Sequence, residues 1–78
     1  MAATRAFVLI ETAVGKTKEV VSALSETANV QSVNVVTGGY DIIVIVESAD
    51  LASVGDTVTT QIHTIPGITR TVTCLAVS

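Results

Sequence analysis

Two runs of consecutive apolar residues, 6–10 (AFVLI) and 42–46 (IIVIV), constrain the fold of this chain more than any other feature. A strand with one solvated face alternates apolar and polar side chains, and neither run alternates. Both faces of each strand are therefore expected to be buried. Helices of the same chain can cover one face, so we expect a second subunit to cover the other. Each aliphatic side chain buried there would contribute about 1.5–3 kcal/mol, and several together would outweigh the entropy of association.

Composition supports self-association and argues against several classes of protein. Hydrophobic residues make up 49% of the 78-residue chain and charged residues only 14%, which is lean in charge for a soluble single domain. The net charge of −3, one Tyr, one Phe and no Trp argue against direct nucleic-acid binding. The apolar runs are far shorter than the roughly 20 residues that span a bilayer. We therefore expect a soluble, cytoplasmic protein that has no membrane contact.

Hydrophobic periodicity predicts six elements in the order βαββαβ. Strands are expected over 5–12, 30–37, 41–47 and 68–77. One helix is expected to be capped by Thr17, and its apolar residues at helical spacing are Val20, Val21, Leu24 and Ala28. A second helix is expected to start at Ser48 or Asp50, and its apolar stripe consists of Leu51, Val54, Val58, Ile62 and Ile65. Right-handed crossovers place both helices on one face of a four-stranded antiparallel sheet. The prediction is an α+β, ferredoxin-like sandwich that forms a single domain over residues 1–78.

The residues that usually carry catalysis or bind metals are scarce. His63 is the only histidine, and it is interpreted as a partly solvated residue of the second helix rather than as a base or ligand. Cys74 is the only cysteine, and its place within the last strand favours a small buried hydrophobe over a redox role. No nucleotide-binding or nucleophile motif is present. We expect no enzymatic activity, no metal and no cofactor.

The segment Gly38-Gly39-Tyr40-Asp41 is the strongest candidate for a binding site. Two glycines between strands predict a tight hairpin turn in which both adopt a positive φ. Freed backbone N–H groups there would bind a carboxylate, and Asp41 or a threonine would accept from an ammonium group. The threonines of the last strand that share one face are Thr69, Thr71 and Thr73. The alternative is that these threonines are simply strand formers and that Asp41 satisfies the turn.

Three stretches of sequence together resemble a known family. They are Leu9-x-x-Thr12-x-x-Gly15-x-x-x-x-Val20, then Val30-x-x-Val33-x-x-Val36-Thr37-Gly38-Gly39-Tyr40-Asp41, and finally Ile65-Pro66-Gly67-Ile68-x-Arg70-Thr71-x-Thr73. In this order they are similar to the Lrp/AsnC family of feast/famine regulators, and more narrowly to its effector-binding RAM domain. The similarity covers essentially the entire chain.

This resemblance implies dimers formed through the sheet faces, commonly arranged as a ring of four dimers. It also implies that amino acids bind at the contact between dimers, near the second hairpin. Carried over by position, the ligand-binding residues are Gly38, Gly39, Tyr40 and Asp41 of the turn with Thr71 and Thr73, and Thr69 is the less secure member. Full-length members also carry an N-terminal helix-turn-helix, whereas this chain starts at the first strand. We therefore expect the stand-alone form, which would not bind DNA itself.

The leading hypothesis is an oligomeric amino-acid-binding module of transcriptional regulation. It would act as a sensor or co-assemble with full-length Lrp/AsnC regulators. One alternative is a small dimeric α+β barrel enzyme of the monooxygenase type, which needs a cavity lined with aromatic residues or histidine. The other is a purely structural assembly domain.

Overall fold

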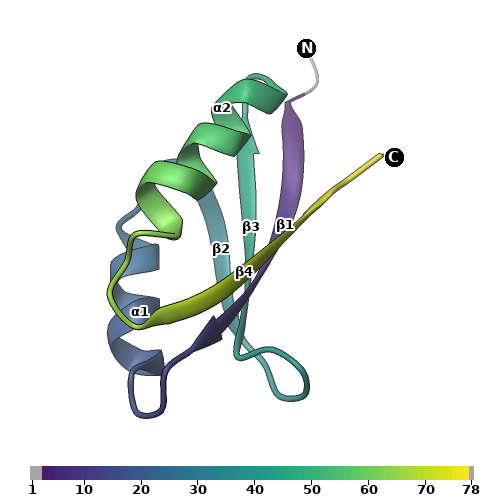
Figure 1. Cartoon of the computed structure of the whole chain (residues 1–78). Coiled ribbons are helices and arrows are strands. Elements are labelled where there is room, and N and C mark those ends of the chain that lie inside the picture. The colour runs from purple at the N-terminus through teal and green to yellow at the C-terminus, as the bar shows by residue number, and fades with distance from the viewer. Residues whose placement is uncertain (1–2, 78) are drawn as a thin grey trace.

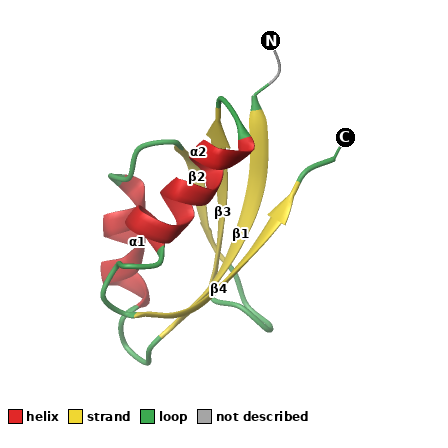
Figure 2. Cartoon of the chain, turned by 45° about the horizontal axis from the view of Figure 1, so that its top comes forward, coloured by secondary structure: helices red, strands yellow, loops and turns green. Residues whose placement is uncertain are grey.

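The computed structural model describes residues 3–77 and shows a four-stranded antiparallel sheet with both helices on one face (Figures 1 and 2). In chain order, the elements are β1 (Thr4–Thr12), α1 (Thr17–Ser25), β2 (Val30–Val35), β3 (Ile42–Ser48), α2 (Leu51–Asp56), its π-helical continuation η1 (Thr57–Ile62), and β4 (Ile68–Leu75). The strands are arranged in the order β2-β3-β1-β4, so the two apolar strands are central. The predicted ferredoxin-like α+β fold is confirmed.

The hydrophobic core lies between the helices and one face of the sheet. Its side chains are at most 1% exposed and come from β1 (Ala6, Val8, Ile10), α1 (Val20, Leu24), β3 (Ile42, Val44, Val46), α2 (Val54) and η1 (Ile62). Leu51, predicted to begin the apolar stripe, is instead 57% exposed, because the inward face of this helix starts at Val54. None of the helices in the described part of the chain is long and apolar enough to cross a membrane.

The second face of the sheet carries apolar residues that no helix covers. We call this surface the open face and define it by Phe7, Leu9, Ile43, Ile45 and Val72. The first four alternate with core residues along β1 and β3, and Val72 of β4 is the register partner of Leu9. All five are only partly buried in the single chain. The uncovered apolar surface predicted from the two runs is therefore present.

The hairpin between β2 and β3 is wider than predicted. β2 ends at Val35 and β3 begins at Ile42, and the Val36 N–H donates to the Asp41 carbonyl oxygen at 2.9 Å. Only Gly38 of the two glycines has a positive φ, +118°. The prediction of a tight turn with two left-handed glycines is wrong, because a six-residue loop spreads the reversal over more peptide bonds.

The predicted helix caps have different outcomes. Asp50 caps α2, since its Oδ1 accepts from the Ser53 N–H at 2.8 Å. Thr17 does not cap α1. The cap position is Lys16, and the Thr17 hydroxyl instead lies 2.9 Å from that of Thr12. α1 also ends at Ser25, before the expected Ala28.

The turn after η1 packs against the start of α1. Gly67 has a φ of +101°, and a Cβ added there would lie 3.0 Å from both Lys16 Cβ and Val20 Cγ2. Its carbonyl oxygen accepts from the Ala13 N–H at 2.7 Å. Only glycine combines this backbone conformation with so close an approach. The Pro66-Gly67 turn therefore fixes the β1–α1 connection.

Candidate functional site

Asp41, at the base of the hairpin loop 36–41, joins the loop to the neighbouring strand. Its Oδ2 accepts from the Thr12 N–H at 2.9 Å and lies 3.3 Å from the Thr12 hydroxyl, which donates to it. Its own N–H donates to the Ile10 carbonyl oxygen at 2.9 Å. The Thr12 hydroxyl also contacts Thr17, the first residue of α1. This partly buried network holds the loop against the end of β1 and the start of α1.

Tyr40 points toward a charged pair on the neighbouring strands. The Arg70 guanidinium carbon lies 6.0 Å from the centre of the Tyr40 ring, within the range of a cation–π interaction. Arg70 Nη1 lies 3.2 Å from Glu11 Oε2, and the two residues are direct partners in the β1–β4 register. Sequence reasoning did not select Glu11 or Arg70. Only the register of two strands far apart in the sequence reveals their pairing.

The threonines of β4 have partners away from Tyr40. Thr71 and Thr73 are register partners of Ile10 and Val8, so they lie on the helix-covered side of the sheet. The Thr71 hydroxyl is 3.3 Å from His63 Nδ1, and Thr69 donates to the Glu11 carbonyl oxygen at 3.2 Å. Within one chain, Arg70 rather than a threonine is therefore the residue of β4 that reaches Tyr40.

The two lone reactive residues lie on different sides of the sheet. His63 is exposed, as expected, but it lies just after the end of η1 rather than within the helix. The Thr71 hydroxyl contacts its ring, which the sequence did not show. Cys74 is exposed, so the prediction of a buried thiol is wrong for the single chain. It lies opposite Phe7 on an edge strand, where the sheet has no cover. Among residues 3–77, His, Cys, Asp and Glu form no group of three or more that could hold a metal ion.

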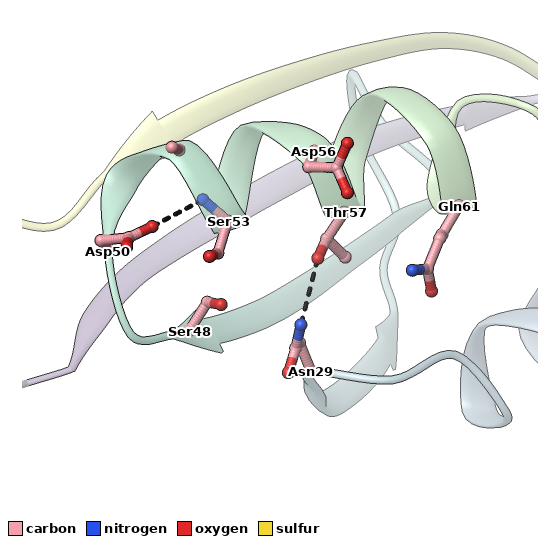
Figure 3. Close-up of a pocket in the computed structure, with 8 residues that line it drawn as sticks. Asn29, Ser48, Asp50, Ser53, Asp56, Thr57 and Gln61 are labelled. Atoms are coloured by element: carbon pink, nitrogen blue, oxygen red, sulfur yellow. Dashed lines mark hydrogen bonds between the residues drawn. The ribbon is translucent and has the colours of Figure 1, made fainter.

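A polar hollow of about 430 Å³ lies at the other end of the molecule (Figure 3). Asn29, Ser48, Asp50, Ala52, Ser53, Asp56, Thr57 and Gln61 line it. Asn29 Nδ2 donates to Thr57 Oγ1 at 3.2 Å, and the Ser53 N–H holds the pKa of Asp50 below its usual value. Several polar groups of the hollow bond to one another, and the hollow is wide open to solvent. It is therefore a weaker candidate for a binding site than the end of the open face beside the hairpin loop 36–41.

Comparison with known proteins identifies the family. The model of the Lrp/AsnC ligand binding domain matches residues 5–78. The chain belongs to this family. A search of curated protein sequences gives no match. The resemblance inferred from the three sequence stretches is therefore confirmed.

Two solved structures of similar size agree with this assignment, and a longer one shares the fold. FFRP-DM1 is 38% identical with a TM-score of 0.90, and the alignment covers 95% of this chain and 99% of that one. TTHA0845 from Thermus thermophilus is 35% identical with a TM-score of 0.91, over 96% and 94% of the two chains. E. coli AsnC, at 20% identity and a TM-score of 0.91, shares the fold over 96% of this chain but only 51% of its own length. The chain thus corresponds to about half of AsnC.

Proposed function

We propose that this Lrp/AsnC ligand-binding domain is a non-enzymatic, oligomeric module that binds a small amino acid at the hairpin loop 36–41. The observation that carries the proposal is the loop itself. Gly38 and Gly39 are exposed at its tip, Tyr40 is half-buried, and Asp41 anchors its base to Thr12. The structure named as the L-Met complex of the transcriptional regulator NMB0573 from Neisseria meningitidis has the same fold and supports an amino acid as the class of ligand.

The proposed oligomer begins with a dimer through the open face. Phe7, Leu9, Ile43 and Ile45 form its apolar centre. An ion pair closes each end of this surface, one between Arg5 and Glu47 and one between Arg70 and Glu11. An apolar centre with a charged rim is the usual anatomy of a protein interface. A second copy of the chain would bury this surface, and pairs of dimers would then bring hairpin loops together.

Placing one charge in the open face tests the dimer. Ile45→Lys puts an ammonium group in the centre of the surface and should convert the dimer to a monomer in analytical ultracentrifugation. Val35→Lys is the matched control, because Val35 is an apolar side chain of the edge strand β2 that is 64% exposed. An Ile45→Lys protein that sediments like the wild type would contradict an interface on this face.

In the cytoplasm, the module would act by linkage and would not bind DNA itself. A ligand seated between dimers stabilises whichever assembly makes those contacts. This ligand-dependent shift in assembly would also change the oligomeric state of full-length Lrp/AsnC regulators that co-assemble with the module. The proposed ligand-binding set is the loop together with the threonines of β4 from the facing copies: Gly38, Gly39, Tyr40, Asp41, Thr69, Thr71 and Thr73.

A thermal-shift screen against the twenty amino acids tests this function. A ligand at about 100 times its Kd stabilises the folded state by roughly 2.7 kcal/mol, which raises the Tm of a small domain by several degrees. We expect a selective shift in the wild type and its loss in Tyr40→Ala, with Val14→Ala as a control because Val14 is fully exposed on another loop. No shift with any amino acid, from a protein that remains oligomeric, would indicate a structural assembly domain instead.

A further inference from the structure

Three side chains meet where the open face ends at the hairpin loop. Arg70 of β4 lies over the ring of Tyr40, and Glu11 of β1 is its ion-pair partner. In the single chain, the Arg70 side chain is 60% exposed and that of Glu11 is 35% exposed, and the pair lies at the rim of the open face rather than at its apolar centre. This arrangement offers an aromatic surface, a cation and an anion within one small area.

An amino-acid effector needs a partner for each of its two charges. Asp41 is the acid nearest the loop tip in sequence, and its Oδ2 accepts two hydrogen bonds from Thr12 that tie the carboxylate to the end of β1. The acid in contact with Arg70 is Glu11.

The other cations of the chain lie elsewhere. Arg5 is paired with Glu47, the register partner at the far end of β1. Lys16 and Lys18 lie at the start of α1. Arg70 is therefore the cation available beside Tyr40.

Arg70 is also held more loosely than the comparable arginine. Its ion pair has one nitrogen–oxygen contact, at 3.2 Å, whereas Arg5 makes two hydrogen bonds to Glu47 at 2.7 and 2.8 Å. An exposed ion pair of this kind contributes little to stability, so exchanging its partner costs little. The guanidinium has five N–H donors in a planar fork that matches a carboxylate.

We propose that Arg70, stacked on Tyr40, binds the α-carboxylate of the effector, and that Glu11, exchanged out of its pair with Arg70, binds the effector's ammonium group. The ligand class is then a free α-amino acid with both charged groups unblocked. This inference rests on the proposed amino-acid-binding function and adds two charged groups from the strands beside the loop.

The test compares blocked and unblocked ligands on matched variants. The probes are the twenty free L-amino acids, followed by the carboxamide and the N-acetyl derivative of the amino acid that binds most tightly, measured by isothermal titration calorimetry. Wild-type protein should bind the free amino acid about tenfold or more tightly than either derivative, because each derivative lacks one charge-assisted pair. Arg70→Gln should lose affinity for the free amino acid and bind the carboxamide as the wild type does. Glu11→Gln should lose affinity for the free amino acid and bind the N-acetyl derivative as the wild type does.

Two further variants separate recognition from general damage. Lys18→Gln removes a positive charge from the exposed surface of α1 and should leave every Kd unchanged. Arg70→Lys keeps the charge but not the planar fork, and its preference for the free amino acid should be intermediate. Because Arg70 is exposed, the Tm of each ligand-free variant should stay close to that of the wild type.

The outcomes distinguish this inference from the proposed function. If the wild type binds an amino acid and Arg70→Gln retains the full preference over the carboxamide, the role of Arg70 is refuted while the binding function stands. If the wild type binds none of the twenty, both are refuted.

Discussion

A graded series of glycine substitutions tests how the turns of this domain are built. Gly39 has no positive φ, and an added Cβ would meet nothing within 4 Å. Gly38 has equal space but a φ of +118°, and Gly67 combines a φ of +101° with two carbon atoms at 3.0 Å. Alanine at Gly39 should therefore cause neither backbone strain nor crowding, alanine at Gly38 should cause backbone strain, and alanine at Gly67 should cause both.

The magnitudes follow from these differences. Gly39→Ala should stay within about 1 kcal/mol of wild type, since alanine mainly restricts the unfolded chain there. Gly38→Ala should cost about 1–3 kcal/mol, because L-residues sparsely populate the backbone region around its φ of +118°. Gly67→Ala should cost that amount plus about 1–3 kcal/mol of overpacking, because neither Lys16 Cβ nor the buried Val20 can swing aside. The sum is a large fraction of the roughly 4–12 kcal/mol expected for 78 residues.

Urea unfolding followed by circular dichroism measures the three free energies. All variants should be compared at one protein concentration, because dimer formation would make the apparent stability depend on it. The expected order of stability is Gly39→Ala, then Gly38→Ala, then Gly67→Ala. Equal stabilities for the Gly38 and Gly67 variants would refute the crowding at the α1 start, and equal stabilities for the Gly38 and Gly39 variants would refute the backbone strain in the hairpin.

Three further predictions concern the core, the α2 cap and the loop anchor. Ile62→Ala, at a fully buried position of η1, should lower the free energy of unfolding by about 2–5 kcal/mol in the same urea assay. The Ser53 N–H lowers the pKa of Asp50, so the cap should stabilise the fold fully above the ordinary value of 3.8 and progressively less as the pH falls through the lowered pKa. The stability difference between wild type and Asp50→Ala, measured by thermal unfolding from pH 2 to 7, should therefore shrink toward acid, and a constant difference would contradict this cause. Asp41→Ala should speed hydrogen exchange at the Thr12 amide, whereas Asp41→Asn, which retains an acceptor, should largely preserve its protection. Equal exchange in both variants and the wild type would show that this hydrogen bond does not hold the loop.

The local pattern of residues along the chain was sufficient to predict the order of the helices and strands, most of the core residues and the family. Runs such as 42–46 and the helical spacing of Val54, Val58 and Ile62 depend only on neighbours along the chain. The same reasoning showed that β1 and β3 have apolar residues on both faces. It overextended β2 to residue 37, because two adjacent glycines are compatible with both a tight turn and a longer loop.

The candidate site was only partly visible, because its contacts join distant segments. Which residue of β1 faces Arg70 is decided by the register of β1 with β4, and a shift of one position would place Glu11 on the other face. The exposure of Cys74 likewise follows from β4 lying at the edge of the sheet.

The sequence by itself therefore determined the elements, the apolar surface to be buried and the position of the hairpin loop, since these follow from periodicity and backbone preference. Only the tertiary structure decided that Asp41 is bonded to Thr12 and that Arg70 lies over Tyr40. Such pairs form across 29 and 30 residues of chain, where strand order and register, not local spacing, bring side chains together.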